Sequence, residues 1–131
     1  MRIRRAVIDA VVGHARREDP MECCGLLIGA GDDVLESRPA RNLRQSRTAY
    51  LVDPEDHFAA IRAARAAGLA VVGGYHSHPR SIPVPSVTDI AEATDPEFLY
   101  VIVSLAATEP EIAAYRIRSG VAFPFPISHF P

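Results

Sequence analysis

The stretch Tyr75-His-Ser-His-Pro79, followed downstream by Ser86 and Asp89, decides how the chain is organised. Side chains alternate between the two faces of an extended strand, so His76 and His78 are expected to project from the same face. Asp89 follows after a short segment and can fold back as a third ligand. Two imidazoles and one carboxylate, with a position left for water, are the ligand set of a catalytic rather than a structural zinc site. A single histidine is more often a surface or core residue, but the combined pattern favours a metal site.

The residues around this motif predict the local structure that holds it. The apolar run 69–75 predicts a strand that delivers His76 to its carboxyl end. Three prolines between residues 79 and 85 predict a stiff loop without regular hydrogen bonding. Beyond the loop, Ser86-Val-Thr-Asp89 predicts the start of a short helix that runs to about Thr94.

The rest of the chain alternates between helical and strand patterns. A helix is expected over residues 4–18, and Asp53-Pro54 predicts the start of a second helix that stops at Gly68. Further strands are expected at 24–29, from Val34 onward as its hairpin partner, at 48–52, at 98–105 and at 112–117, with a proline-broken edge strand at 121–127. The prediction is one α/β domain over residues 1–131, with a mixed central sheet flanked by about three helices.

Composition excludes several classes of function. A net charge of −2 argues against a protein that binds nucleic acid by neutralising phosphates. No apolar run is long enough to span a bilayer, and the segment after Met1 is amphipathic, so we expect a cytoplasmic protein without a membrane partner. Cys23 and Cys24 are adjacent in sequence and cannot readily pair with each other, so no disulfide framework is expected.

All fourteen basic residues are arginines, so a lysine nucleophile or Schiff base is excluded. Arg38, Arg41, Arg44 and Arg47 recur at every third position, which is close to helical spacing. Pro39 and the lack of an apolar stripe favour an irregular, solvated connection instead. A docking patch for an acidic partner is the less favoured interpretation of these arginines.

A metal ion alone does not complete a hydrolase, because a second group must take a proton from water and hand it to a leaving amine. Glu22 is the best candidate, since it directly precedes a predicted buried strand, where a charged residue is otherwise hard to explain. The alternative is that Glu22 lies in an exposed loop after the first helix. Asp9, Glu92 and Glu97 are weaker candidates because they occupy amphipathic or surface positions.

Ser86 has two interpretations that can coexist. In a capping box, Ser86 and Asp89 satisfy backbone donors at the start of a helix, and the local pattern favours this role. In a catalytic role, the hydroxyl group polarises a substrate carbonyl as part of an oxyanion hole.

Together these residues resemble the JAMM (MPN-plus) metalloprotease family. The resemblance rests on His76-x-His78-Pro79, then six residues, Ser86, two residues and Asp89. Upstream, Pro20-Met-Glu22-Cys-Cys24-Gly25-Leu-Leu is similar to the family's proline-x-Glu-x-Cys-Gly-leucine stretch. The similarity extends from the first predicted helix to the strand after Asp89.

The resemblance implies an MPN, cytidine-deaminase-like fold with one zinc ion held by His76, His78 and Asp89. It also implies that Glu22 is the general base and acid and that Ser86 assists the tetrahedral intermediate. Family members hydrolyse peptide or isopeptide bonds, commonly after the C-terminal glycine of ubiquitin or a ubiquitin-like protein. This chain is too short for the insertions with which larger members grip a second ubiquitin. It resembles compact bacterial members that act on ubiquitin-like sulfur carriers, so we expect such a protein as its substrate.

Two other functions compete with that of a zinc peptidase. Family relatives that lack the ligand residues serve as non-catalytic scaffolds or protein-interaction modules, and the presence of all five motif residues argues against this alternative. A DNA-repair relative with a similar metal motif fits less well, because the chain is acidic and has no helical DNA-binding extension.

Overall fold

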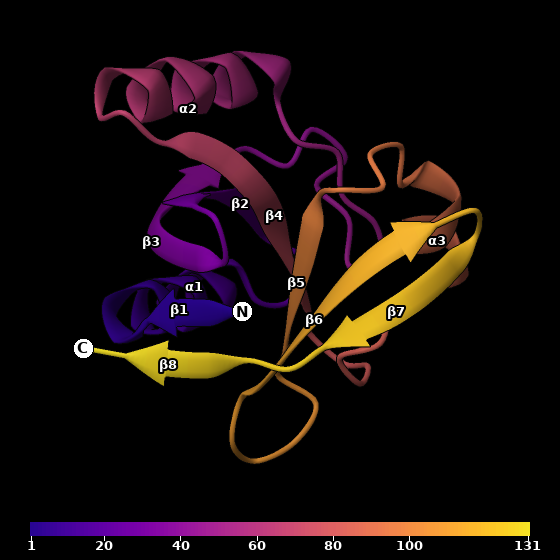
Figure 1. Ribbon diagram of the computed structural model, residues 1–131. Helices are drawn as coiled ribbons and strands as arrows, with labels where there is room; N and C mark the ends of the chain where they lie inside the picture. The colour runs from indigo at the N-terminus through magenta and orange to yellow at the C-terminus, as the bar shows by residue number, and fades with distance from the viewer.

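The computed structural model describes residues 1–131, which form one eight-stranded sheet and three helices (Figure 1). The sheet order is β7-β6-β5-β4-β2-β3-β1-β8, with parallel and antiparallel pairs, so the predicted α/β class with a mixed sheet is confirmed. The helices are α1 (Arg5–Glu18), α2 (Pro54–Ala66) and α3 (Val87–Glu92). The strands are β1 (Arg2–Arg4), β2 (Cys24–Ala30), β3 (Asp33–Ala40), β4 (Ala70–His78), β5 (Leu99–Ser104), β6 (Glu111–Arg118), β7 (Val121–Phe125) and β8 (Ser128–Phe130).

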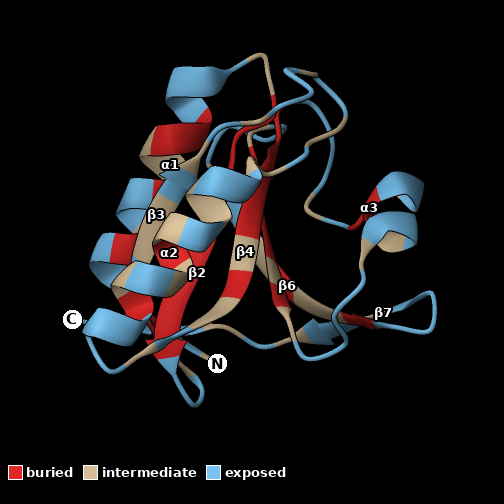
Figure 2. Ribbon diagram, turned by 90° about the horizontal axis from the view of Figure 1, so that it is seen from above, coloured by how far each residue is buried: buried red, intermediate tan, exposed pale blue.

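Helices α1 and α2 pack on opposite faces of the sheet. Leu27 of β2 belongs to a core cluster that contains Val11 of α1. Leu26 and Ile28, on the other face of the same strand, pack with Ala64 of α2. Because neighbouring residues of a strand point to opposite faces, β2 is buried on both sides (Figure 2). Both helices therefore fix β2, the strand that begins two residues after Glu22.

Strand β4 lies in the middle of the sheet, between β2 and β5. It runs antiparallel to β2, with Cys24 opposite His76, and parallel to β5, with Ile102 opposite His76. The sequence predicts a strand that ends at Tyr75, whereas β4 continues through His78. The backbone of His76 is thus paired with a neighbouring strand on each side, and that of His78 is paired with β5.

The predicted boundaries of α2 are confirmed. The Asp53 side chain accepts a hydrogen bond from the Glu55 amide at 2.9 Å, and proline occupies the first turn. Gly68 adopts φ +72°, a left-handed conformation that glycine reaches without strain, two residues after the helix ends.

The predicted strand at 48–52 is wrong. Only a single bridge between Asn42 and Val52 forms there, and the residues between them make an irregular loop. The four arginines at every third position are expected in an irregular connection. This prediction is wrong for Arg38, which lies in β3, and is confirmed for Arg41, Arg44 and Arg47. Arg41 lies within 4 Å of the Asp53 and Asp56 carboxylates, and Arg44 pairs with Glu92 at 2.7 Å. Two of these arginines therefore have acidic partners within the chain.

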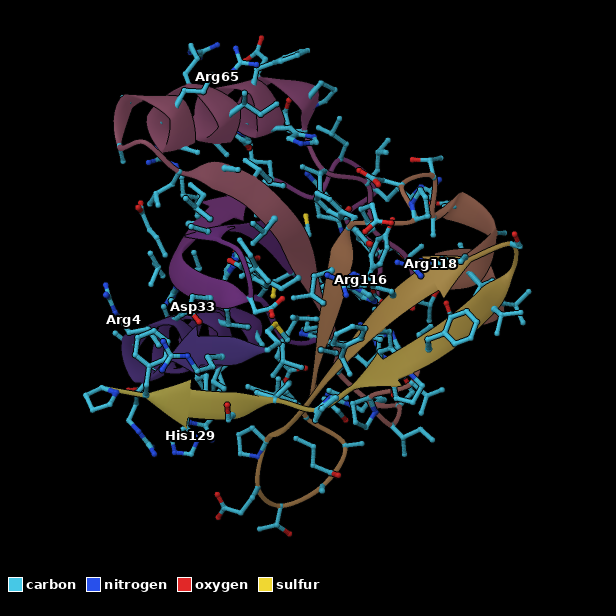
Figure 3. The ribbon with its side chains drawn as sticks, viewed as in Figure 1. Arg4, Asp33, Arg65, Arg116, Arg118 and His129 are labelled. Carbon is cyan, nitrogen blue, oxygen red and sulfur yellow. The ribbon has the colours of Figure 1, made fainter.

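Two short strands at the chain ends were not predicted. β1 pairs in parallel with both β3 and β8, so the two termini lie at the same edge of the sheet. Arg4, Asp33 and His129 mark this meeting point, while Arg116 and Arg118 lie on β6 (Figure 3). β7 forms the opposite edge, as the prolines predict.

The cysteines and the helices bear on the expected lack of disulfides and of membrane spans. Cys23 and Cys24 are buried free thiols, as expected. None of the helices has the length and apolar character needed to cross a membrane.

Candidate metal centre

The two histidines of the motif converge with Asp89. The Nε2 atoms of His76 and His78 lie 3.2 Å apart, and the Asp89 Oδ2 atom lies 3.0 Å from the first and 3.1 Å from the second. All three residues are buried. The sequence prediction that these side chains share one site is confirmed by this geometry.

Helix α3 positions the Asp89 carboxylate. The Ser86 hydroxyl oxygen accepts a hydrogen bond from the Asp89 amide at 3.0 Å, and the Ser86 amide donates to Asp89 Oδ2 at 2.9 Å. These reciprocal bonds form the predicted capping box. The same Oδ2 atom faces both imidazoles, so the helix cap also aims the carboxylate at the histidines.

The loop 79–85 orients the second imidazole. His78 Nδ1 lies 2.9 Å from the Ile82 carbonyl oxygen, to which it can donate its proton, so that Nε2 is left as the lone-pair donor. The loop is itself held by the Ser104 hydroxyl, which donates to the Ser81 carbonyl at 2.6 Å, and by Tyr115, which donates to the Pro83 carbonyl at 2.7 Å. The loop 79–85 is thus held to β5 and β6 and in turn orients the His78 imidazole.

Burial and hydrogen bonds oppose each other in setting the charges of the three groups. Burial lowers the pKa of His76, which favours the neutral imidazole that binds metals. Burial also lowers the pKa of His78, but its hydrogen bonds to Asp89 and to the Ile82 carbonyl raise this pKa by more. Burial would raise the pKa of Asp89, and its hydrogen bonds to both histidines hold this pKa below its ordinary value instead. The carboxylate therefore stays ionised, as an anionic ligand must.

Glu22 lies beside this group because of strand pairing. The Cys24–His76 register of β2 and β4 extends by one residue, since Ser77 donates its amide to the Cys23 carbonyl at 3.1 Å and the Ser77 hydroxyl accepts from the Cys23 amide at 2.8 Å. The next pair in this register places Glu22 opposite His78. The alternative of an exposed loop is wrong, because Glu22 is only 4% exposed.

The Glu22 carboxyl group is buried and has a raised pKa. Its Oε1 atom is buried and has no hydrogen-bond partner. Burial raises the pKa of Glu22 from 4.5 to about 7, while the charge of His78 lowers it and that of Asp89 raises it. A carboxyl group whose pKa is near neutrality can both accept and release a proton at ordinary pH.

Asp9, Glu92 and Glu97 are not part of the His76, His78 and Asp89 group, although Glu92 lines the cavity beside Asp89. Asp9 is exposed on α1. Glu92 pairs with Arg44, and Glu97 pairs with Arg118 at 3.2 Å.

Sequence reasoning missed Tyr50. Its ring stacks on the His76 imidazole, with centroids 4.3 Å apart and planes 20° from parallel. Tyr50 lies in the irregular loop between β3 and α2, and no local pattern indicates where a loop residue points. The only sign of Tyr50 in the sequence is an aromatic residue within the expected strand 48–52, which does not indicate a contact with His76.

The residues present fit a divalent metal ion. Two imidazole nitrogens and one carboxylate oxygen converge on one point, which is the donor set of a three-ligand catalytic zinc site. Glu22 is not part of this donor set, but the charges of His78 and Asp89 act on its carboxyl group, and its buried Oε1 atom is unpartnered. Such an arrangement leaves a carboxylate free to act on a molecule bound at the metal.

Comparison with known proteins agrees with this geometry. Residues 4–118 match the model of the family described as prokaryotic homologs of the JAB domain. The chain belongs to this family. The resemblance to JAMM metalloproteases is thereby confirmed.

Several characterised relatives are similar over most of the chain. A desampylase of Haloferax volcanii is 41% identical over 103 residues, which cover 73% of this chain and 74% of the relative. The CysO-cysteine peptidase of Mycobacterium tuberculosis is 37% identical over 129 residues, covering 96% and 88%. A probable TtuB-protein conjugate cleaving protease of Thermus thermophilus is 37% identical over 92 residues, covering 70% and 62%.

Solved structures confirm the JAB/MPN fold. A protein from Desulfitobacterium hafniense superposes with a TM-score of 0.90 at 31% identity, over 98% of this chain and 92% of the other. A JAB1/MPN domain protein from Archaeoglobus fulgidus superposes with a TM-score of 0.64 at 21% identity, over 98% and 97%. The second likeness concerns the fold alone.

Proposed function

We propose that this protein is a zinc-dependent peptidase that cleaves peptide or isopeptide bonds after the C-terminal glycine of a ubiquitin-like or sulfur-carrier protein. The observation that carries the proposal is the convergence of His76, His78 and Asp89 beside the buried, unpartnered carboxylate of Glu22. The substrate class is supported by the names of the relatives, among them a CysO-cysteine peptidase and a TtuB-conjugate cleaving protease. A cytoplasmic location stays a prediction.

In this proposal, His76, His78 and Asp89 hold the zinc ion. The ion supplies Lewis-acid chemistry, which lowers the pKa of a water molecule toward about 7 and polarises a carbonyl group. Glu22 takes the proton of the attacking water on its carboxylate and later releases it to the leaving amine. Its pKa of about 7 suits both steps.

Ser86 can serve the substrate without leaving its helix cap. Its hydroxyl oxygen accepts the Asp89 amide proton, and a hydroxyl group has one further proton to donate. We assign this proton to the substrate carbonyl oxygen, where it would stabilise the negative charge that develops during attack.

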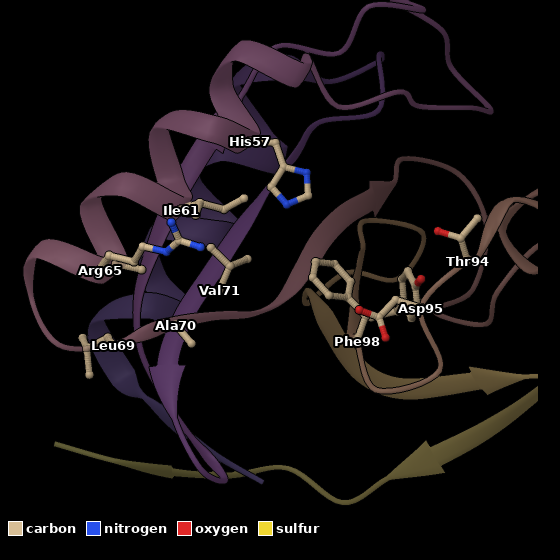
Figure 4. A pocket seen from close by; sticks show the side chains of 11 residues that line it. His57, Ile61, Arg65, Leu69, Ala70, Val71, Thr94, Asp95 and Phe98 are labelled. Atoms are coloured by element: carbon tan, nitrogen blue, oxygen red, sulfur yellow. The ribbon is translucent and has the colours of Figure 1, made fainter.

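A groove leads away from the site. A cavity of about 260 Å³ is lined by Tyr50 and Asp89, and it shares His57, Thr94 and Tyr100 with a second cavity of about 550 Å³. The second cavity continues between α2, the start of β4 and the segment before β5 (Figure 4). An open groove that has Asp89 in its wall fits an extended chain terminus rather than a folded surface.

Activity can be tested with a ubiquitin-like sulfur-carrier protein whose C-terminal glycine is linked to cysteine, and with one linked to a lysine side chain. We expect mass spectrometry to detect the free carrier with the zinc-loaded protein and not after chelation. Glu22→Gln should retain about one zinc per chain and lose roughly 10²–10⁴-fold in turnover. Asp9→Asn, which removes an exposed carboxylate, is the matched control and should keep full activity.

Two outcomes would overturn the proposal. Glu22→Gln with full activity would remove the assigned proton carrier. Failure to bind zinc under conditions in which the protein is folded would favour a non-catalytic interaction module.

A further inference from the structure

The side chain of Asn42 uses every hydrogen-bonding position of its amide. Its Nδ2 atom donates to the carbonyl oxygens of Glu22 and Ala49, both at 3.1 Å. Its Oδ1 atom accepts from the amides of Arg44 and Leu51, both at 3.0 Å. An amide side chain has two protons and two lone pairs, so this group is saturated.

These four bonds join two parts of the candidate site. One partner is the backbone of Glu22, and two others flank Tyr50, whose ring covers the His76 imidazole. The Glu22 amide also donates to the Ser46 carbonyl of the same loop at 2.8 Å. The proton carrier and the aromatic residue that packs on a metal ligand are therefore held to one another through Asn42.

The Glu22 carboxylate depends on this backbone for its position. Its Oε1 atom has no hydrogen-bond partner, so no such bond fixes that oxygen. The loop 43–51 has no regular structure, and the Asn42 amide replaces the ladder bonds that a strand would supply there. Loss of this amide would leave four backbone groups without their partner.

We propose that Asn42 is a positioning residue of the peptidase, whose amide holds the backbone of Glu22 and the Tyr50 loop in one arrangement. The inference rests on the proposed function, because Glu22 needs a fixed position only if it transfers protons. Small displacements of a catalytic group are costly, since proton transfer requires hydrogen-bond distance.

The hydrogen bonds can be tested without any substrate. Asn42 and Gln45 are the only asparagine and glutamine of the chain, so an NMR spectrum contains two side-chain amide pairs. Gln45→Ala, at an exposed position, assigns them by removing one pair. We expect the Asn42 NH₂ protons to exchange with solvent at least about tenfold more slowly than those of Gln45, because they are internally bonded. Equal exchange rates would overturn the inference even if the protein is an active peptidase.

Kinetics test whether Asn42 acts through Glu22. At saturating zinc, Asn42→Ala should lower kcat at least about tenfold and raise KM by a smaller factor, because the Tyr50 loop that it holds also lines the cavity beside Asp89. Thr48→Ala, in the same loop, is the matched control, since the exposed Thr48 side chain makes one hydrogen bond, to the Ser46 hydroxyl at 3.5 Å. It should keep kcat within about twofold.

A double-mutant comparison separates positioning from a general structural effect. In the Glu22→Gln background, Asn42→Ala should lower the residual kcat by less than about twofold, because the proton carrier that it positions is already disabled. An equal tenfold loss in both backgrounds would show that Asn42 does not act through Glu22. If no carrier adduct is cleaved by the wild-type protein, the proposed function fails, and the NMR comparison still decides whether the amide holds the loop.

Discussion

The ring of Tyr50 lies 4.3 Å from the imidazole of His76, nearly parallel to it. The two residues come from different parts of the fold, since one lies in the loop after β3 and the other in the centre of the sheet. The stack restrains rotation of the imidazole about its side-chain bonds. A metal ligand whose orientation is fixed before binding loses less entropy when the ion arrives.

This contact predicts different effects for two substitutions of Tyr50. Tyr50→Phe keeps the aromatic ring and should change zinc affinity by less than about twofold, because no protein group bonds the phenol oxygen. Tyr50→Ala removes the stack and should weaken zinc binding by roughly 10–100-fold, the range seen when groups that orient metal ligands are lost. Competition with a chelating dye measures both constants. Equal affinity in the two variants would contradict the orienting role.

Metal binding should stabilise the fold. An ion that binds only the native state stabilises it by about 2.7 kcal/mol at a free concentration one hundred times the dissociation constant. We therefore expect zinc to raise the melting temperature of the chelator-treated protein. His78→Ala should abolish this increase, whereas His129→Ala, at an exposed position near the C-terminus, should retain it. An unchanged increase in His78→Ala would place the zinc elsewhere.

The raised pKa of Glu22 predicts a pH dependence of stability in the metal-free protein. Between pH 4.5 and about 7 the native state keeps a proton that the unfolded chain has lost, so this residue makes stability fall as pH rises. Glu22→Gln lacks the titration and should gain stability relative to the wild type across that window. The difference should level off above pH 7 at about 3 kcal/mol at most.

Urea unfolding of both proteins at several pH values, in the presence of a chelator, measures this difference. Comparison of the two proteins cancels the contributions of other titrating groups. A difference that stays constant from pH 5 to pH 8 would show that the Glu22 carboxyl does not titrate near neutrality.

The features that sequence alone predicted are those set by short-range rules. The spacing of His76 and His78 fixes a common face on any strand, and the capping box fixes Asp89 at the start of a helix. Glu22 is different, because its place opposite the histidines depends on the pairing of β2 with β4, about fifty residues apart. The residues alone make Glu22 the best candidate for a proton carrier, and the family resemblance strengthens that prediction.

The features that sequence missed depend on contacts between distant segments. β1 and β8 are three residues each and exist because the two chain ends meet, which no local period reveals. The apolar character of 48–52 predicted a strand, but the Asn42 side chain bonds the backbone of this segment and competes with ladder pairing. The position of Tyr50 on His76 follows from that loop and was equally hidden.

Gly25 is expected to be indispensable because of its neighbour on β4. A Cβ atom at this position would overlap the Tyr75 ring and the Arg38 carbonyl oxygen. The Tyr75 ring cannot move away freely, since it is buried and its hydroxyl lies 2.8 Å from His14 Nδ1. Gly25→Ala must therefore push β2 away from β4 or from β3, the adjacent strand.

We expect this substitution to destabilise the protein by about 1–3 kcal/mol, as overpacking of a core does. It should also reduce activity, because Glu22 lies two residues before β2 and His76 lies on β4. Gly13→Ala is the matched control. A Cβ atom there meets only the flexible end of Arg17 at 3.4 Å, and alanine in a helix interior is favoured over glycine by about 1 kcal/mol. Thermal unfolding should show a lower melting temperature for Gly25→Ala and an equal or higher one for Gly13→Ala, and carrier cleavage should fall only in Gly25→Ala. A stable, active Gly25→Ala protein would contradict the close packing of β2 on β4.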